Sequence, residues 1–182
     1  MLSTLIYLTA LATAAMAQER WRHLQWNPDP LAPYTNSREF WFPSYEVGKV
    51  PVTHENGDRI TLSAPGVALY MGSALRFTPG KSGHLLTATG KPGEKWCIDA
   101  GLDPHNGAIV KLWQCIDNHP PQEWIVANGQ VKLAGTNFCL DVPGGDARGR
   151  PDLQIWECSC NKNQAWRVRC TLQPDIVPDC AD

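Results

Sequence analysis

Short apolar segments with alternating positions fill the C-terminal half of the chain. Val131 and Leu133, and the segments 140–142, 153–156 and 166–168, place apolar side chains at every second position. This period of two is typical of half-buried β-strands. Asn128-Gly129 and the segment 143–146 stand between these segments as turn signals. Short strands at roughly ten-residue spacing predict an all-β barrel or sandwich.

A longer apolar run opens the chain. Residues 2–17 carry no charged side chain and end in Ala15-Met16-Ala17 before Gln18. Such a run, with small residues at −3 and −1, is typical of a secretory signal peptide, and we expect cleavage after Ala17. The alternative is a membrane anchor, for which the run is short. We therefore expect a secreted, extracellular chain without a membrane span.

Four landmarks of the C-terminal half recur after 42 or 43 residues. The pairs are Cys97 and Cys139, Trp113 and Trp156, Cys115 and Cys158, and Trp124 and Trp166. One period that relates four separate landmarks indicates a repeated supersecondary unit.

Each unit has the same three motifs. The first reads Cys97-Ile98-Asp99, then the segment 110–115 (VKLWQC), then the segment 122–124 (QEW); the second reads FCLD, LQIWEC and QAW at 138–141, 153–158 and 164–166. Over residues 91–170 this pattern resembles the ricin-B-type lectin family. The resemblance implies a β-trefoil of three such units around a pseudo-threefold axis. It also implies disulfides between Cys97 and Cys115 and between Cys139 and Cys158.

The third unit that this fold requires is expected upstream, in degenerate form. The segment 56–62 is similar to 128–133, and the segments 67–70, 74–77 and 84–87 supply further expected strands. This unit has no cysteine and no Gln-x-Trp motif. The alternative is a shortened unit beginning at Cys180, which would leave the barrel open with exposed strand edges. We expect the all-β trefoil to span residues 54–170, with a degenerate first unit.

Two flanking segments belong to no unit in this assignment. Residues 18–53 combine Trp21, Trp26 and the aromatic segment 40–42 with several prolines, which exclude a long helix. We expect an arm packed against the trefoil; the alternative is an aromatic platform for polysaccharide. Residues 171–182 are expected to form a C-terminal tail.

Composition narrows the function classes. Charged residues make up 19 % of the chain and the net charge is −2, so no basic excess favours nucleic acid. All seven cysteines follow residue 96, which in a secreted chain predicts a disulfide framework, with Cys160, Cys170 and Cys180 unassigned. The chain lacks hydrolase, zinc-protease and phosphate-loop motifs, so we expect no enzyme activity, no metal and no cofactor.

The second clear unit has the side chains that a sugar site needs. If its cysteines bond across antiparallel strands, Asp141 lies opposite Trp156, with Gln154 further along the same face. An indole can stack on the apolar C–H face of a pyranose, while carboxylate and carboxamide groups bind its hydroxyls. The family's pattern assigns the site to Asp141, Gln154, Trp156, Asn163 and Gln164.

The first clear unit has a weaker version of this set. It keeps Asp99, Trp113 and Gln122, but Lys111 replaces Gln154 and Pro121 replaces Asn163. The degenerate unit is expected to be silent because Tyr70 stands where its Asp would be. Gln122 and Gln164 can also satisfy backbone groups, and the tryptophans two residues after them are expected in the core.

We therefore expect a secreted lectin that binds a glycan in a shallow site of the last repeat. The family commonly binds galactose and N-acetylgalactosamine. The first alternative is a β-trefoil scaffold that binds a protein partner, as inhibitor or effector, with a vestigial sugar site. The second is the binding module of a polysaccharide-degrading enzyme.

Overall fold

A computed structural model describes residues 21–26, 38–41, 54–62, 74–87, 93–146 and 148–170. These residues form short strands and three 3-10 turns. The strands are β1 (Trp21–Trp26), β2 (Arg38–Trp41), β3 (Thr61–Leu62), β4 (Ala74–Arg76), β5 (Ser82–His84), β6 (Leu86–Thr87), β7 (Trp96–Asp99), β8 (Lys111–Gln114), β9 (Glu123–Ala127), β10 (Gln130–Leu133), β11 (Phe138–Asp141), β12 (Gln154–Glu157) and β13 (Trp166–Cys170). The turns are η2 (Pro120–Gln122), η3 (Pro143–Gly145) and η4 (Lys162–Gln164).

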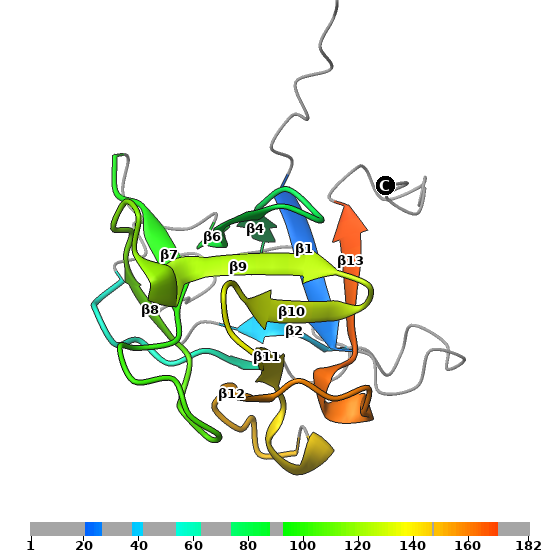
Figure 1. Ribbon diagram of the computed structural model, residues 1–182. Coiled ribbons are helices and arrows are strands. Elements are labelled where there is room, and N and C mark those ends of the chain that lie inside the picture. Colours follow the sequence, from blue (N-terminus) through cyan, green and yellow to red (C-terminus); the bar gives the residue numbers. More distant parts are fainter. Residues whose placement is uncertain are drawn as a thin grey trace, which may run out of the picture.

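The strand pairing repeats three times. β1 pairs with β13 and β2, β6 pairs with β4 and β7, and β10 pairs with β9 and β11, all antiparallel. β5 precedes β6 across Leu85 and pairs with β9. Each unit adds one hairpin, which is β2–β3, β7–β8 or β11–β12. The three units, β1–β4, β5–β9 and β10–β13, make the chain a β-trefoil (Figure 1).

The barrel closes between its first and last described strands. β1 and β13 pair from Arg22 opposite Cys170 to Trp26 opposite Trp166, and they lie side by side in Figure 1. Leu24 in β1 is fully buried in the core. The barrel thus begins upstream of the boundary expected at residue 54. Within the segment 18–53, residues 21–26 and 38–41 form strands of the first unit rather than an arm outside it.

Two Asn-Gly turns show how the first unit aligns with the second. The Asn56 Oδ1 accepts a hydrogen bond from the backbone N–H of Gln114 at 2.8 Å, and the Asn106 Oδ1 accepts one from that of Glu157 at 2.7 Å. Each turn thus docks on the third strand of the next unit. The segment 56–62 therefore corresponds to 106–112, whereas the sequence comparison aligned it with 128–133.

The first unit also differs at the position of the site carboxylate. In the second and third units an Asp ends the second strand and faces the first residue of the third strand. In the first unit Trp41 occupies that register position, opposite Thr61. Tyr70, which we expected there, lies outside the described residues.

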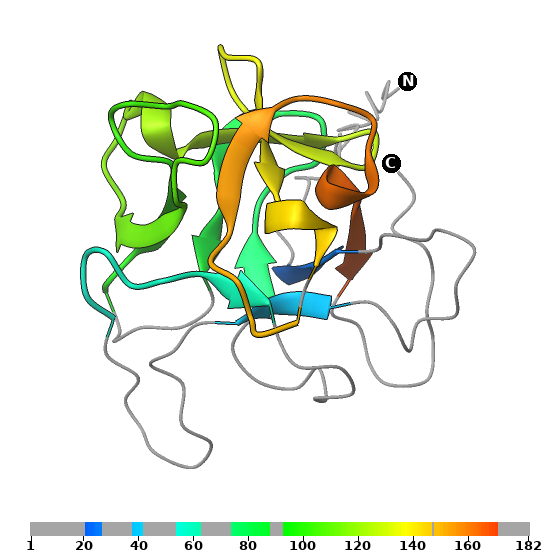
Figure 2. The ribbon, with the colours of Figure 1, turned by 90° about the horizontal axis from the view of Figure 1, so that it is seen from below.

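One residue of each unit meets the others at the centre of the barrel. Ile60, Val110 and Leu153 are all fully buried. The Val110 N–H donates to the Leu153 carbonyl at 2.9 Å, and the Leu153 N–H donates to the Ile60 carbonyl at 2.8 Å. These bonds tie the three units together about one axis. Figure 2 shows the second unit in green and the third in yellow to orange.

The tryptophans of both Gln-x-Trp motifs fill the barrel, as expected. Trp124 and Trp166 are 1 % and 4 % exposed. Their indole N–H groups donate to the carbonyls of Ile98 and Leu140, each at 2.9 Å. Because a buried indole N–H needs an acceptor, the same bond in both units fixes the last strand against the second.

Both disulfides implied by the family resemblance are present, Cys97–Cys115 and Cys139–Cys158. The strand register differs from the expected one. Asp141 lies opposite Gln154, and Cys139, not Asp141, lies opposite Trp156. The disulfide therefore joins residues that are diagonal in the register, and the assumption of a directly opposed pair shifted the expected pairing by two residues along β12.

Candidate functional site

The predicted site residues of the third unit come together at one edge of the barrel. Asp141 ends β11, Gln154 and Trp156 lie on β12, and Asn163 and Gln164 lie in η4. Alternate positions of the β11–β12 hairpin share a face, so the carboxylate, the carboxamide and the indole all lie on its outer side.

Two carboxamides hold the Asp141 carboxylate. Gln154 Nε2 donates to Oδ1 at 2.9 Å, and Gln164 Nε2 donates to Oδ2 at 3.2 Å. Asp141 is only 2 % exposed, so these bonds satisfy a charge that is nearly out of water. Each carboxylate oxygen can accept more than one hydrogen bond, so both retain capacity for a further donor.

Burial decides the ionisation of Asp141. Loss of hydration raises the pKa of this carboxyl above its usual value, and the bonds from Gln154 and Gln164 offset part of that rise. The two amide donors favour the ionised form, because an N–H bonds a carboxylate more strongly than a carboxylic acid.

Gln164 lies beneath the site. Its Nε2 also donates to the Glu157 carbonyl at 3.0 Å, and its Oε1 accepts from the Ser159 N–H at 2.8 Å. With 1 % exposure and both N–H donors engaged, Gln164 joins β11, β12 and the loop after β12. It therefore positions Asp141 from below.

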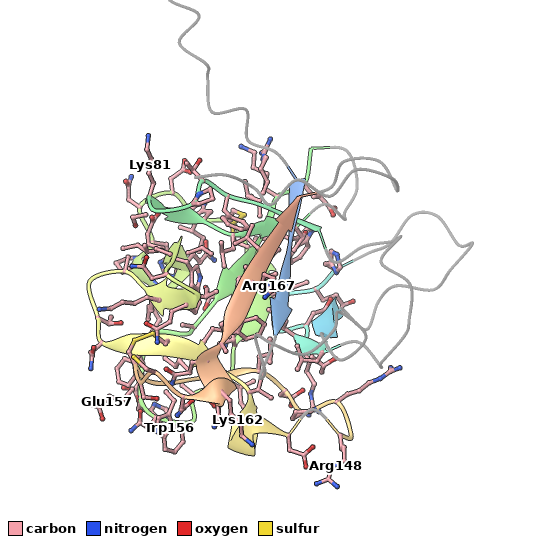
Figure 3. All side chains as sticks on the ribbon, turned by 90° about the vertical axis from the view of Figure 1, so that its right-hand side faces the viewer. Lys81, Arg148, Trp156, Glu157, Lys162 and Arg167 are labelled. Carbon is pink, nitrogen blue, oxygen red and sulfur yellow. A yellow bond between two sulfur atoms is a disulfide. The ribbon has the colours of Figure 1, made fainter. Side chains whose placement is uncertain are left out.

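Trp156 is the exposed member of the set. It is 44 % exposed, and its side chain points outward at the rim of the barrel (Figure 3). Its Cζ3 lies 3.8 Å from the place where a Cβ on Gly107 would be. The Asn106-Gly107 turn of the second unit therefore borders the third unit's site. Sequence reasoning missed this turn, although the earlier Asn56-Gly57 pair was a signal for it.

A turn with two glycines borders the other side. Gly144 and Gly145 have φ of +63° and +62°, a region that favours glycine. A Cβ on Gly145 would overlap the Asn163 carboxamide oxygen, so η3 approaches η4 closely. The Asn163 carbonyl accepts from the Val142 N–H at 3.0 Å, which keeps η4 beside β11. Asn163 is thus held at the site by backbone contacts.

Comparison with known protein families gives a direct match. Residues 73–169 match the ricin-type beta-trefoil lectin domain, which is more than half of the chain. The chain belongs to this lectin family. Membership suggests carbohydrate binding, and the family is generally non-enzymatic.

A solved structure supports the trefoil assignment. The crystal structure of the designed three-fold symmetric protein ThreeFoil is similar, with a TM-score of 0.58 and 14 % sequence identity. The match covers 84 % of this chain and 99 % of ThreeFoil. At this identity the similarity concerns the fold alone.

The second unit of the lectin domain repeats the support of the site. Gln122, which is fully buried, donates from Nε2 to the Asp99 Oδ2 at 2.9 Å and to the Gln114 carbonyl at 3.0 Å. Its Oε1 accepts from the Ile116 N–H at 2.9 Å. These bonds match those of Gln164, so both units hold their carboxylates by the same device.

The outer face of that unit differs. Lys111 stands in the Gln154 position, and its Nζ lies 5.1 Å from the centre of the Trp113 ring. A cation at this distance covers the aromatic face on which a sugar would stack. Asp99 Oδ1 instead accepts from the Gly101 N–H at 2.7 Å. The set Asp99, Trp113 and Gln122 is therefore brought together, but with a different surface.

Two further observations concern other site types. His84, Cys97 and Cys115 lie close together, but both sulfurs are engaged in the disulfide and offer no thiolate to a metal. In the described part of the chain, no helix has the length and apolar character to cross a membrane. Residues 1–17, the predicted signal peptide, lie outside the described residues.

Proposed function

We propose that this lectin-family chain is a secreted carbohydrate-binding protein whose glycan site lies in the third unit. One observation carries the proposal. Trp156 presents a half-exposed indole beside a buried carboxylate that two carboxamides hold in place. An apolar platform next to fixed hydrogen-bond acceptors suits a pyranose, which has an apolar face and a rim of hydroxyls.

Each residue has a distinct role in this proposal. Trp156 stacks on the sugar's C–H face, and Asp141 accepts hydrogen bonds from two hydroxyls. Gln154 and Asn163 orient the remaining hydroxyls, because a carboxamide both donates and accepts. Gln164 supports Asp141 without touching the sugar. The resulting site is shallow, so we expect millimolar affinity, about −4 kcal/mol, which multivalent presentation would raise.

The proposed location agrees with the chemistry of the fold. Disulfides form and persist in oxidising compartments, and the second and third units each carry one. Together with the predicted signal peptide, they support secretion. The second unit is proposed as a weaker or altered site, because Lys111 covers its tryptophan.

A glycan array with matched variants tests the proposal. The oxidised protein would be compared with Asp141→Asn and Trp156→Ala, and with Asp99→Asn and Trp113→Ala as the equivalent changes in the second unit. We expect the third-unit variants to bind glycan at least about tenfold more weakly than the wild-type protein. The second-unit variants are expected to bind with nearly the wild-type affinity. Thermal unfolding would check that each variant is folded.

Two results would contradict the proposal. Equal losses in both pairs would mean that the third unit has no special role. No binding by a folded wild-type protein would favour a trefoil scaffold that recognises a protein partner, the main alternative function.

A further inference from the structure

The Asn106–Ile109 turn of the second unit is docked along β12 of the third unit. The Gly107 N–H donates to the Ile155 carbonyl at 2.9 Å, and the Ile155 N–H donates to the Ala108 carbonyl at 2.9 Å. Ile109 pairs with Gln154 in an antiparallel bridge. The turn therefore extends the β11–β12 hairpin by one strand-like segment, and the proposed sugar site continues onto it.

Two cross-strand rows form on this extended surface. The first runs from Asp141 through Gln154 to Ile109. Since Ala108 and Val110 are buried, the alternation directs Ile109 to the outer face, where it is 46 % exposed.

The second row runs from Cys139 through Trp156 to Gly107. Gly107 has a φ of +90° and no side chain, and the Trp156 ring edge lies 3.8 Å from its missing Cβ. The edge of the indole therefore lies beside the backbone of this turn. Trp156 and Ile109 are thus two half-exposed apolar side chains on one face, which is typical of a contact surface.

The other units do not repeat this arrangement. Beside the second unit's hairpin, the position equivalent to Ile109 is Arg59, which pairs with Lys111. Beside the first unit's hairpin it is Asp152, which pairs with Thr61. The Arg59 guanidinium and the Asp152 carboxylate form an ion pair at 3.3 Å. An apolar side chain occupies this position only beside the third unit's hairpin.

We propose that Ile109 is a specificity-determining residue that forms an apolar subsite next to Trp156. The subsite takes an apolar group attached to the sugar that stacks on Trp156, such as an aromatic aglycone. This inference rests on the proposed glycan site, and it adds that the site is shared between two units. The subsite makes a glycoside with an apolar aglycone a better ligand than the methyl glycoside of the same sugar.

Methyl and p-nitrophenyl glycosides of galactose, N-acetylgalactosamine, glucose and mannose, in both anomers, would serve as probes in NMR titrations. The measured quantity is the ratio of p-nitrophenyl to methyl affinity for each sugar that binds. In Ile109→Ser this ratio is expected to fall about three- to tenfold, with methyl glycoside affinity nearly unchanged. Ile116→Ser is the matched control, because Ile116 is 43 % exposed and follows β8 in the second unit.

A second variant keeps the test decisive if Ile109→Ser is poorly folded. Ile109→Trp enlarges the apolar surface and is expected to raise the ratio. An unchanged ratio in both Ile109 variants, with methyl glycosides still bound, overturns this inference and leaves the proposed function standing. If no glycoside binds the wild-type protein, the proposed function fails and the inference fails with it.

Discussion

The second and third units share one internal support but present different outer faces. In both, a disulfide closes the hairpin, a buried glutamine holds a buried aspartate, and a tryptophan N–H bonds the second strand. The outer row reads Asp99, Lys111, Arg59 in the second unit and Asp141, Gln154, Ile109 in the third. The motifs that identify the family therefore lie in the shared internal support, whereas the outer faces of the two units differ in the outer row of residues.

A backbone difference explains why the Asp99 and Asp141 carboxylates have different hydrogen-bond donors. Gly101, two residues after Asp99, donates its N–H to the Asp99 Oδ1. Pro143, two residues after Asp141, has no N–H to offer. Gln154 takes over the bond to the Asp141 Oδ1. The proline thus makes a side chain, rather than the backbone, the partner of the carboxylate.

The largest expected effect tests the shared support. Gln122→Leu and Gln164→Leu each leave a buried carboxylate oxygen and two backbone groups without their partner, so each should cost about 3 kcal/mol or more. Urea unfolding would measure both. We expect similar losses of stability, with weakened glycan binding only in Gln164→Leu. A cost in one unit alone would mean that the two supports are not equivalent.

The pH dependence should isolate Asp141. Its pKa is raised by burial, and sugar hydroxyls need the carboxylate as acceptor. Affinity should therefore fall as pH drops through this raised pKa, by about tenfold per pH unit below it. The stability of the fold should change with pH in the opposite direction. Because the pKa of Asp141 is raised by folding, its contribution to stability is fully present below the unfolded pKa and is lost as pH rises through the folded pKa.

Titrations of a bound glycoside at several pH values would locate the midpoint. Asp99→Asn is expected to leave the profile unchanged, because the proposed main site lies in the third unit. A midpoint at or below the usual aspartate pKa would contradict the link between burial and binding.

A smaller effect is expected from converting the second unit's face into that of the third. Lys111→Gln with Arg59→Ile removes the cation over Trp113 and restores the row of the third unit. We expect a gain of about tenfold in affinity at this unit, seen as one equivalent of bound glycoside. The test is done in Trp156→Ala, where the third unit's site is removed. No gain would mean that Pro121, not Lys111, limits the second unit.

The parts that sequence could predict are those with repeated landmarks. The two cysteine pairs and the Gln-x-Trp motifs predicted the β-trefoil and placed Trp124 and Trp166 in the core. The first unit lacks these landmarks, so β1 and β2 were missed and the segment 56–62 was aligned with the wrong strand. Short alternating segments resemble one another, and only pairing distinguishes a first strand from a third.

Contacts between units also escaped prediction. The register of β11 and β12 depends on whether the two bonded cysteines lie directly opposite each other or diagonally across the strands. The spacing of the cysteines in the sequence does not decide between these arrangements. The approach of Gly107 to Trp156 joins segments of different repeats, and a comparison of repeats with each other does not reveal it. The sequence allowed Gln164 either to contact the sugar or to support the site from within the fold, and its burial favours the supporting role.

The pairing of β1 with β13 has a consequence for biosynthesis. A growing chain lacks the partner of β1 until the residues of β13 have been made, so no N-terminal fragment can form the closed barrel. Contacts between such distant segments are slow to form, because a long loop must close first. The barrel can therefore close only after the residues of β13 have left the ribosome.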